Sequence, residues 1–417
     1  MTQSPDKPFA ASPPVTRCSG CDLVLQPCQT DSDHLAICPR CATKLAHGRR
    51  LSFNGEIALA LTILVLFLPA HLLPLLSIDL LGKTITTSVL TGAKILWSSF
   101  PFVASLVVFC ASFAPLLFTC ALLVMHLSRR QQSIRWFRPA VRVIAHSRHW
   151  VMADVLMVSL AIACFKIQDY ATLHFSVGLA CYATIQILLS VLLVRVNTQR
   201  YWDAFTRPAP EPEPSPLIRC SHCGLTQGHH ESAHCRRCHL PLHRRMVRSE
   251  QKTWACLITA TIFLFPANLF PISILFSNGI RLEDTIFSGV ASLINNGMPG
   301  IAAIIFTASI VVPVAKILGL SLILISLRCT TAITPRQHMW LYRGVKWIGK
   351  WSMMDLFVIA FMVALVDRGR IMDFMPGPGA IAFGLVVVLT MLATEFLDTR
   401  LIWDHHERQT RHTLTDR

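Results

Sequence analysis

Charged residues are scarce in this chain. Of its 417 residues, 15% are charged and 53% are hydrophobic, whereas soluble domains hold roughly 25% charged residues. The apolar residues gather into stretches close to the roughly 20 residues that cross a hydrocarbon core of about 30 Å. This composition excludes an ordinary soluble domain and indicates a membrane protein.

Motifs of common enzyme classes are also missing. The chain holds no Walker motif, no Gly-x-Ser-x-Gly elbow and no paired carboxylates in a hydrolase arrangement, so we expect neither ATP use nor covalent catalysis. The net charge of +15 would suit a polyanion. However, the arginines lie in short segments between apolar runs, with few aromatic residues arranged for base stacking. We therefore predict a protein that is not an enzyme and does not bind nucleic acid.

Eight apolar segments are candidates for membrane helices. Basic residues crowd the loops after the second and the sixth segments, and the alternate loops hold few, so the positive-inside rule places both termini in the cytoplasm. The N-terminal residues lack an apolar core, so we expect the first membrane helix, not a cleaved signal peptide, to direct insertion. The predicted segments are 56–76, 100–127, 151–168, 173–196, 254–276, 299–327, 352–366 and 379–397.

The chain is also a tandem repeat. Cys38-x-x-Cys41 recurs as Cys235-x-x-Cys238, and Leu68-Pro69-Ala70-His71 recurs at the same offset as Phe265-Pro266-Ala267-Asn268. An even number of helices per unit gives the two halves the same orientation, so a pseudo-two-fold axis along the membrane normal is expected. Further ordered matches pair Ala111-Ser112 with Ala308-Ser309, Pro115 with Pro313, the Trp-x-Met-x-Asp motif at 150–154 with that at 351–355, and Trp202-Asp203 with Trp403-Asp404.

These repeats divide the chain into domains. We predict an all-α polytopic membrane protein made of two units of about four transmembrane helices, each preceded by a small cytoplasmic zinc ribbon. The boundaries are 1–50 for the N-terminal tail and first ribbon, 51–205 for the first transmembrane unit and 206–217 for a Pro-rich linker. They continue with 218–248 for the second ribbon, 249–405 for the second transmembrane unit and 406–417 for a cytoplasmic tail.

The cysteines form two modules with zinc-ribbon spacing. Each module holds two Cys-x-x-Cys pairs, and four thiolates complete a closed tetrahedral shell that suits structural zinc. A disulfide framework is disfavoured by a reducing cytoplasm, and a thioredoxin-like redox pair would need a βαβ context that is absent. Because such short segments lack a core, metal binding would supply much of their folding free energy. The expected ligands of the two zinc ions are Cys18, Cys21, Cys38 and Cys41, and Cys220, Cys223, Cys235 and Cys238.

Together these motifs resemble the paraquat-inducible protein A family: two cysteine modules, each leading into a Pro-containing helix and later into a Trp-x-Met-x-Asp helix start. The resemblance covers nearly the whole chain. It implies a bacterial inner-membrane protein that passes lipid between the inner membrane and a periplasmic MCE-domain tunnel protein, and so contributes to outer-membrane integrity. The alternative is a zinc-dependent scaffold or stress or redox sensor that anchors a periplasmic partner without transporting lipid.

Lys316 is the clearest charged residue at membrane depth. A charge there costs about 2.5–3.5 kcal/mol on insertion scales, so a retained one indicates function. Ser309 lies two helical turns earlier and therefore on the same face. The matching position in the first half is Phe118, so we expect a working site mainly in the second half.

The family resemblance adds further members to a transport polar cluster around Lys316 and Ser309. It implies Thr390 from the last membrane helix and a carboxylate from the Trp-x-Met-x-Asp motif, which is Asp154 or Asp355 here. Structural roles stay open for each, because carboxylates stabilise helix N-termini and membrane Ser and Thr often bond to their own helix.

Overall fold

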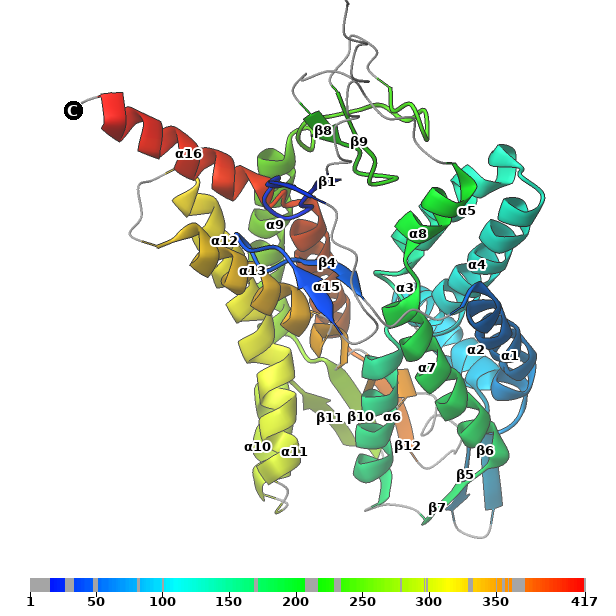
Figure 1. Ribbon diagram of the computed structural model, residues 1–417. Helices are drawn as coiled ribbons and strands as arrows, with labels where there is room; N and C mark the ends of the chain where they lie inside the picture. Colours follow the sequence, from blue (N-terminus) through cyan, green and yellow to red (C-terminus); the bar gives the residue numbers. More distant parts are fainter. Residues whose placement is uncertain are drawn as a thin grey trace, which may run out of the picture.

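The computed structural model shows two halves whose long helices and three-stranded sheets follow a common order (Figure 1). The structure describes residues 16–26, 34–47, 52–80, 83–99, 101–168, 172–206, 217–228, 234–277, 280–295, 297, 299–328, 333–349, 351–354, 357–358, 360–361 and 372–415. The Pro-rich linker therefore lies almost entirely outside the described residues.

The first half opens with two small hairpins that carry the first cysteine module and continues into helices. Its elements are β1 (Thr16–Arg17), β2 (Val24–Leu25), β3 (Leu35–Ile37), β4 (Lys44–His47), α1 (Phe53–Leu72), β5 (Leu76–Leu80), β6 (Lys83–Thr87), α2 (Val89–Ser99), α3 (Pro101–Val108), a π-helical turn (Phe109–Phe113), α4 (Ala114–Arg130), α5 (Ile134–Ser147), α6 (Ala153–Gln168), β7 (Thr172–Phe175), α7 (Val177–Arg195) and α8 (Thr198–Phe205).

The elements of the second half follow a similar order along the chain. They are β8 (Leu217–Arg219), β9 (Thr226–Gly228), α9 (Ser249–Leu269), β10 (Ser273–Ser277), β11 (Ile280–Asp284), α10 (Ile286–Asn295), α11 (Pro299–Phe306), a π-helical turn (Thr307–Val311), α12 (Val312–Ser326), α13 (Pro335–Gly349), a 3₁₀ turn (Trp351–Met353), β12 (Met372–Pro376), α15 (Pro378–Phe396) and α16 (Arg400–Thr415). The predicted C-terminal tail is thus largely the end of helix α16.

Six helices in the described part of the chain are long and apolar enough to cross a membrane, and they match six of the eight predicted segments. The third predicted segment forms α6, whose 16 residues are short for a membrane of usual thickness. The seventh lies mostly outside the described residues, so four spanning helices per half are not confirmed. The six helices are Phe53–Leu72, Pro101–Arg130, Val177–Arg195, Ser249–Leu269, Ala302–Ser326 and Pro378–Phe396.

The matching prolines Pro115 and Pro313 each follow a π-helical turn inside a long helix. Proline has no N–H to donate to the carbonyl four residues earlier, and its ring crowds that turn. The helix adjusts by widening, so that Ala114 N–H donates to Phe109 O and Val312 N–H donates to Thr307 O, each across five residues. Such π-bulges let a long helix continue past a proline.

The prediction of an all-α fold was wrong in one respect, because each half also holds a three-stranded antiparallel sheet. The sheets have the orders β6-β5-β7 and β11-β10-β12, and they lie at the opposite end of the helices from the cysteine modules (Figure 1). The predicted segments 56–76 and 254–276 ran too far, into β5 and β10. Pro74 and Pro271 follow the helix ends, and the alternating Leu-Ser-Ile-Asp-Leu run that begins at Leu76 is typical of a strand.

Matching glycines pack the sheet end closely. A Cβ at Gly178, in the first turn of α7, would fall within 3.0 Å of the carbonyl oxygen of Pro74, and one at Gly379 in α15 would fall within the same distance of the carbonyl oxygen of Phe270. Only a residue without a side chain allows backbone to approach this closely.

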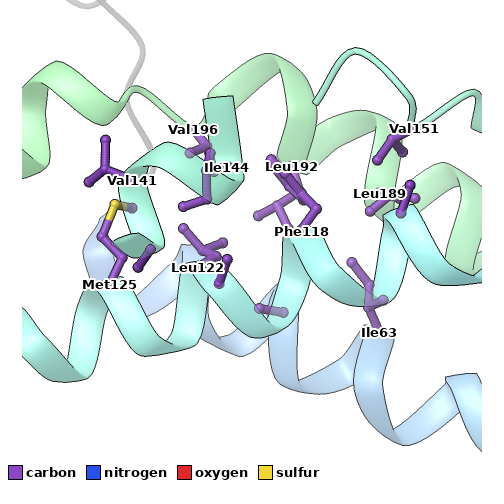
Figure 2. Close-up of a cluster of buried hydrophobic side chains, with 14 of the residues drawn as sticks. Ile63, Phe118, Leu122, Met125, Val141, Ile144, Val151, Leu189, Leu192 and Val196 are labelled. Atoms are coloured by element: carbon purple, nitrogen blue, oxygen red, sulfur yellow. The ribbon is translucent and has the colours of Figure 1, made fainter. Parts of the chain in front are cut away.

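The hydrophobic core of the first half is centred on α4. Helix α1 packs along α7 and α4 packs along α5. Phe118, Leu122 and Met125 of α4 point among side chains of the surrounding helices, including Ile144 and Leu192 (Figure 2). In the second half α9 packs along α15, and α12 along α13. The repeat therefore preserves helix packing as well as sequence motifs.

The two halves contact each other through a second core. Met152 and Val155, at the start of α6, share a hydrophobic cluster with Phe357 and Phe383 of the second half. Ser159 Oγ of α6 donates a hydrogen bond of 3.0 Å to the carbonyl oxygen of Met354. The short helix α6 thus lies at the boundary between the halves.

The first cysteine module packs on the second half, not on the helices that follow it. Arg343 of α13 donates hydrogen bonds to the carbonyl oxygen of Cys41 and to Thr43 Oγ1. Arg40 forms a 2.7 Å ion pair with Glu407 of α16. The four cysteines of this module share a hydrophobic cluster with side chains of α12, α13, α15 and α16.

The second cysteine module packs on the first half. Arg237 donates to Asp203 Oδ1 at 2.7 Å and to the carbonyl oxygen of Thr206 at 2.8 Å. The four cysteines of this module share a cluster with side chains of α4, α5, α7 and α8. Each module therefore rests on the half that it does not precede, an exchange that joins the halves at this end of the molecule.

Arg245 connects the first cysteine module to the C-terminal helix α16. Its guanidinium donates to Asp22 Oδ2 of the first module at 2.7 Å and to both carboxylate oxygens of Asp404 at 2.6 Å. The two carboxylates, Asp404 foremost, raise the pKa of Arg245. Bidentate charged pairs of this kind are stronger than single hydrogen bonds.

We predict that Arg245→Ala destabilises the folded protein by on the order of 2 kcal/mol, because two carboxylates lose a charged hydrogen-bond partner. The apparent melting temperature of the purified protein in detergent measures the effect. The neighbouring exposed Arg244 provides the control, and Arg244→Ala should leave the melting temperature nearly unchanged. Equal effects of the two substitutions would contradict the role assigned to Arg245.

Candidate functional site

The eight predicted metal ligands come together in two clusters. Within each cluster the four sulfur atoms lie within 4.8 Å of one another, and all eight cysteines are buried. Cys18 Sγ lies 3.4 Å from Cys41 Sγ, and Cys223 Sγ lies 3.5 Å from Cys235 Sγ. Four thiolates bound tetrahedrally at about 2.3 Å would lie about 3.8 Å apart, close to these separations. Both clusters therefore fit a metal ion of that size.

The same backbone turn recurs at all four Cys-x-x-Cys pairs. The N–H of the first cysteine donates to the carbonyl of the residue five positions later, and its carbonyl accepts from the N–H four positions later. The residue directly after the second cysteine has positive φ in every case. These residues are Asp22, Ala42, Gly224 and His239. Each turn presents two sulfur atoms side by side, which is how a Cys-x-x-Cys pair supplies two ligands to one metal.

We predict about one bound metal ion per cluster in the purified protein. Cys38→Ser and Cys235→Ser should each lower the metal content by one ion, because a tetrahedral shell with one thiolate replaced binds far more weakly. Elemental analysis of the protein measures this. Cys256 of α9 lies outside both clusters, so Cys256→Ser is the control and should keep the full metal content. Unchanged metal in Cys38→Ser or Cys235→Ser would contradict the assignment.

Lys316 lies in α12 within the span Ala302–Ser326 and is 1% exposed. Its Nζ atom has no hydrogen-bond partner among the described residues. Helix α13 runs back along α12, so that its last residue, Gly349, reaches Lys316: a Cβ at Gly349 would lie 3.9 Å from Lys316 Nζ. The partial negative charge at a helix C-terminus favours an ammonium group there, but it does not replace a hydrogen-bond partner.

Other buried hydroxyl groups belong to elements around Lys316. Ser309 lies in the second π-helical turn, is 1% exposed, and has no partner for its Oγ among the described residues. Thr390 of α15 is also buried, but its hydroxyl donates to Val387 O at 3.0 Å, as expected of a membrane threonine that bonds to its own helix. Helix α12 contacts both α15 and this π-helical turn.

Ser352 is a member of this region that the sequence analysis missed. It is fully buried in the 3₁₀ turn Trp351–Met353, and its Oγ has no partner among the described residues. The turn contacts α12, α15 and the second π-helical turn. The available signal was the repeat itself, since the matching residue in the first half is the apolar Val151.

Of the two candidate carboxylate residues, one lies among the described residues and the other does not. Asp154 is the second residue of α6 in the first half, where a structural role at the helix N-terminus stays open. Asp355 lies outside the described residues. The structure therefore brings Lys316, Ser309 and Thr390 onto contacting elements, and the position of a carboxylate partner stays a prediction.

The first half has a different set of side chains at the matching positions. Phe118, in place of Lys316, is fully buried in the core of α4 (Figure 2). His71 matches Asn268, and its Nδ1 lies 2.9 Å from Phe67 O while its Nε2 lies 2.9 Å from Ser112 Oγ. Because a carbonyl oxygen only accepts, Nδ1 carries a proton and donates to Phe67 O. Both ring nitrogens of His71 thus have partners in this geometry.

Comparison with known proteins places these features in a family. The family model described as Paraquat-inducible protein A matches residues 53–206 and 250–407, one match in each half. No solved structure matches the chain.

The relatives are similar to this chain over almost its whole length. Lipophilic envelope-spanning tunnel protein A of Escherichia coli K12 is 38% identical over 94% of this chain and 91% of its own. A probable intermembrane transport protein of Haemophilus influenzae is 34% identical over 95% of this chain and 98% of its own. Intermembrane transport protein PqiA of Escherichia coli K12 is 30% identical over 93% of this chain and 95% of its own. On the family match in both halves and on these identities, this chain belongs to the paraquat-inducible protein A family.

Proposed function

We propose that this chain is the inner-membrane subunit of an intermembrane lipid transport system. In this proposal it passes lipid between the inner membrane and a periplasmic MCE-domain tunnel protein, and so contributes to outer-membrane integrity. The names of its relatives, which describe intermembrane transport and a lipophilic envelope-spanning tunnel, support transport across the envelope. The lipid and the MCE partner are parts of the proposal.

The positions of the arginines and tryptophans support one orientation of the protein in the membrane. Helices α5 and α13, at the end that holds the cysteine modules, carry many arginines together with the exposed Trp136, Trp340 and Trp347. Arginine marks cytoplasmic loops, and tryptophan is enriched at membrane interfaces. We therefore place both termini and both modules in the cytoplasm. The two sheets then face the periplasm, where the tunnel partner would bind.

The observation that carries the proposal is the partnerless ammonium of Lys316 inside the second half. Burying such a group is costly, and it has no hydrogen-bond partner in the described structure, so its retention favours a role in transport. In our proposal lipid enters between the helices of the second half. The cluster of Lys316, Ser309 and Thr390, with Asp154 or Asp355 as the carboxylate, then rearranges or changes protonation as the lipid passes.

We assign zinc to both cysteine clusters, in a structural role. Four thiolates leave no open coordination position, which excludes a metal-bound water for catalysis and suits a permanently bound ion. Each module packs on the half that it does not precede, and it can do so only when it is folded. The metal ion, by keeping the module folded, would therefore help to hold the two halves together. The same packing would also suit a scaffold that anchors a partner without transporting lipid.

We predict that Lys316→Met keeps the protein folded and abolishes function. Replacing a buried charge with an apolar residue of similar length is usually neutral or stabilising, so the melting temperature should stay the same or rise. Complementation of outer-membrane integrity in a strain lacking the native protein should nevertheless fail.

Lys94→Met is the matched control, because Lys94 is exposed on α2 in the first half; it should complement fully. Protein level and co-purification of the MCE partner are measured in both variants. Full rescue by Lys316→Met would refute the transport role of the cluster and favour the scaffold.

A further inference from the structure

A cavity lies away from Lys316, in the first half near the sheet end. It has a volume of about 60 Å³, and most of its wall is apolar. Helix α2 contributes Gly92, Ala93 and Leu96, and the first π-helical turn contributes Ala111. None of the described members of the Lys316 cluster lines it, so it is a separate site.

One polar group in the wall of this cavity lacks a partner. Thr87, at the end of β6, is 4% exposed, and its Oγ1 has no hydrogen-bond partner among the described residues. Ser112 also lines the cavity, but its hydroxyl is held by His71 Nε2 at 2.9 Å. A buried hydroxyl without a partner costs free energy, and a ligand oxygen next to Thr87 would remove that cost.

The size of the cavity and the side chains that line it indicate which class of ligand could bind there. The volume of about 60 Å³ is more than one water molecule needs, and the mostly apolar wall disfavours a charged headgroup and suits a narrow apolar chain. A linear hydrocarbon chain fits such a wall, and an ester carbonyl accepts the one unused hydrogen bond. A lipid acyl chain has both features.

We propose that this cavity binds the ester end of a single acyl chain of a membrane lipid, with the ester carbonyl accepting a hydrogen bond from Thr87. The proposal rests on the proposed lipid transport only for the source of the ligand. It gives the first half a lipid-binding role of its own, although this half lacks a counterpart of Lys316.

The wall of the cavity also connects the two halves. Leu160 of α6 and Phe361 of the second half occupy matching positions in the repeat, and both line the cavity. A chain bound there therefore touches the boundary between the halves.

Photo-crosslinking tests the site directly. The full-length protein is reconstituted in nanodiscs of phosphatidylethanolamine and phosphatidylglycerol that contain a phosphatidylethanolamine with a diazirine near the ester end of one acyl chain. After illumination, adducts are mapped by mass spectrometry. We expect adducts on α2 and on the first π-helical turn. Ala93→Leu and Ala111→Leu, which fill the cavity, should each lower them by at least about fivefold.

Thr87→Val tests the hydroxyl without changing volume, and it stays informative if a filling variant fails to fold. Losing one hydrogen bond should lower the adducts by about fivefold. Thr86→Val is the control, because Thr86 is exposed on the other face of β6, and it should leave the adducts unchanged. Adducts found only on the outer faces of the helices, or adducts that survive both filling substitutions and Thr87→Val, would overturn the proposal.

Lys316→Met separates this proposal from the transport function. It should leave the adducts unchanged even where it abolishes complementation. Adducts that persist while Lys316→Met complements fully would contradict the transport role of the Lys316 cluster and leave the acyl-chain site standing.

Discussion

Hydrogen bonds between each cysteine module and the opposite half join the two halves at one end of the molecule. Inside a bilayer, helices gain little from the hydrophobic effect, because lipid tails are as apolar as their own side chains. The cysteine modules supply an attachment of a different kind. Arg343 binds the backbone at Cys41, and Arg237 binds Asp203 and the backbone at Thr206, so each module is fixed to the opposite half. Since modules this short need a metal to fold, we infer that metal binding and the arrangement of the membrane helices are coupled.

The repeat preserves the backbone and diverges in its polar side chains. Prolines, π-helical turns, sheets and close-packed glycines occur in both halves at matching positions. Lys316 and Ser352, by contrast, correspond to Phe118 and Val151 in the first half. Duplication thus supplies two similar frameworks, and the polar residues make them unequal. In our account the second half holds the group that works during transport, and the first half holds an apolar site for a lipid chain.

Much of this could be predicted from sequence, because the governing signals are local or periodic. Cysteine spacing predicted both clusters, hydropathy predicted six of the spanning helices, and the repeat predicted the matching halves. Hydropathy failed near Leu76 and Ser273, where strands that hold several apolar residues begin a few residues after apolar helices end. The exchange of the modules could not be predicted, since it depends on contacts between segments far apart, such as Arg343 with Cys41. Ser352 was missed because serine at a helix start is usually a local cap, and its burial and its mismatch with Val151 in the repeat set it apart.

The central claim is that lipid passes through the second half by way of Lys316. Transfer of a fluorescent phospholipid from proteoliposomes to the purified periplasmic partner tests it most directly, with wild type, Lys94→Met and Lys316→Met reconstituted at equal density. The account predicts equal transfer for wild type and Lys94→Met, and transfer at the protein-free background for Lys316→Met. Wild-type transfer by Lys316→Met would contradict it.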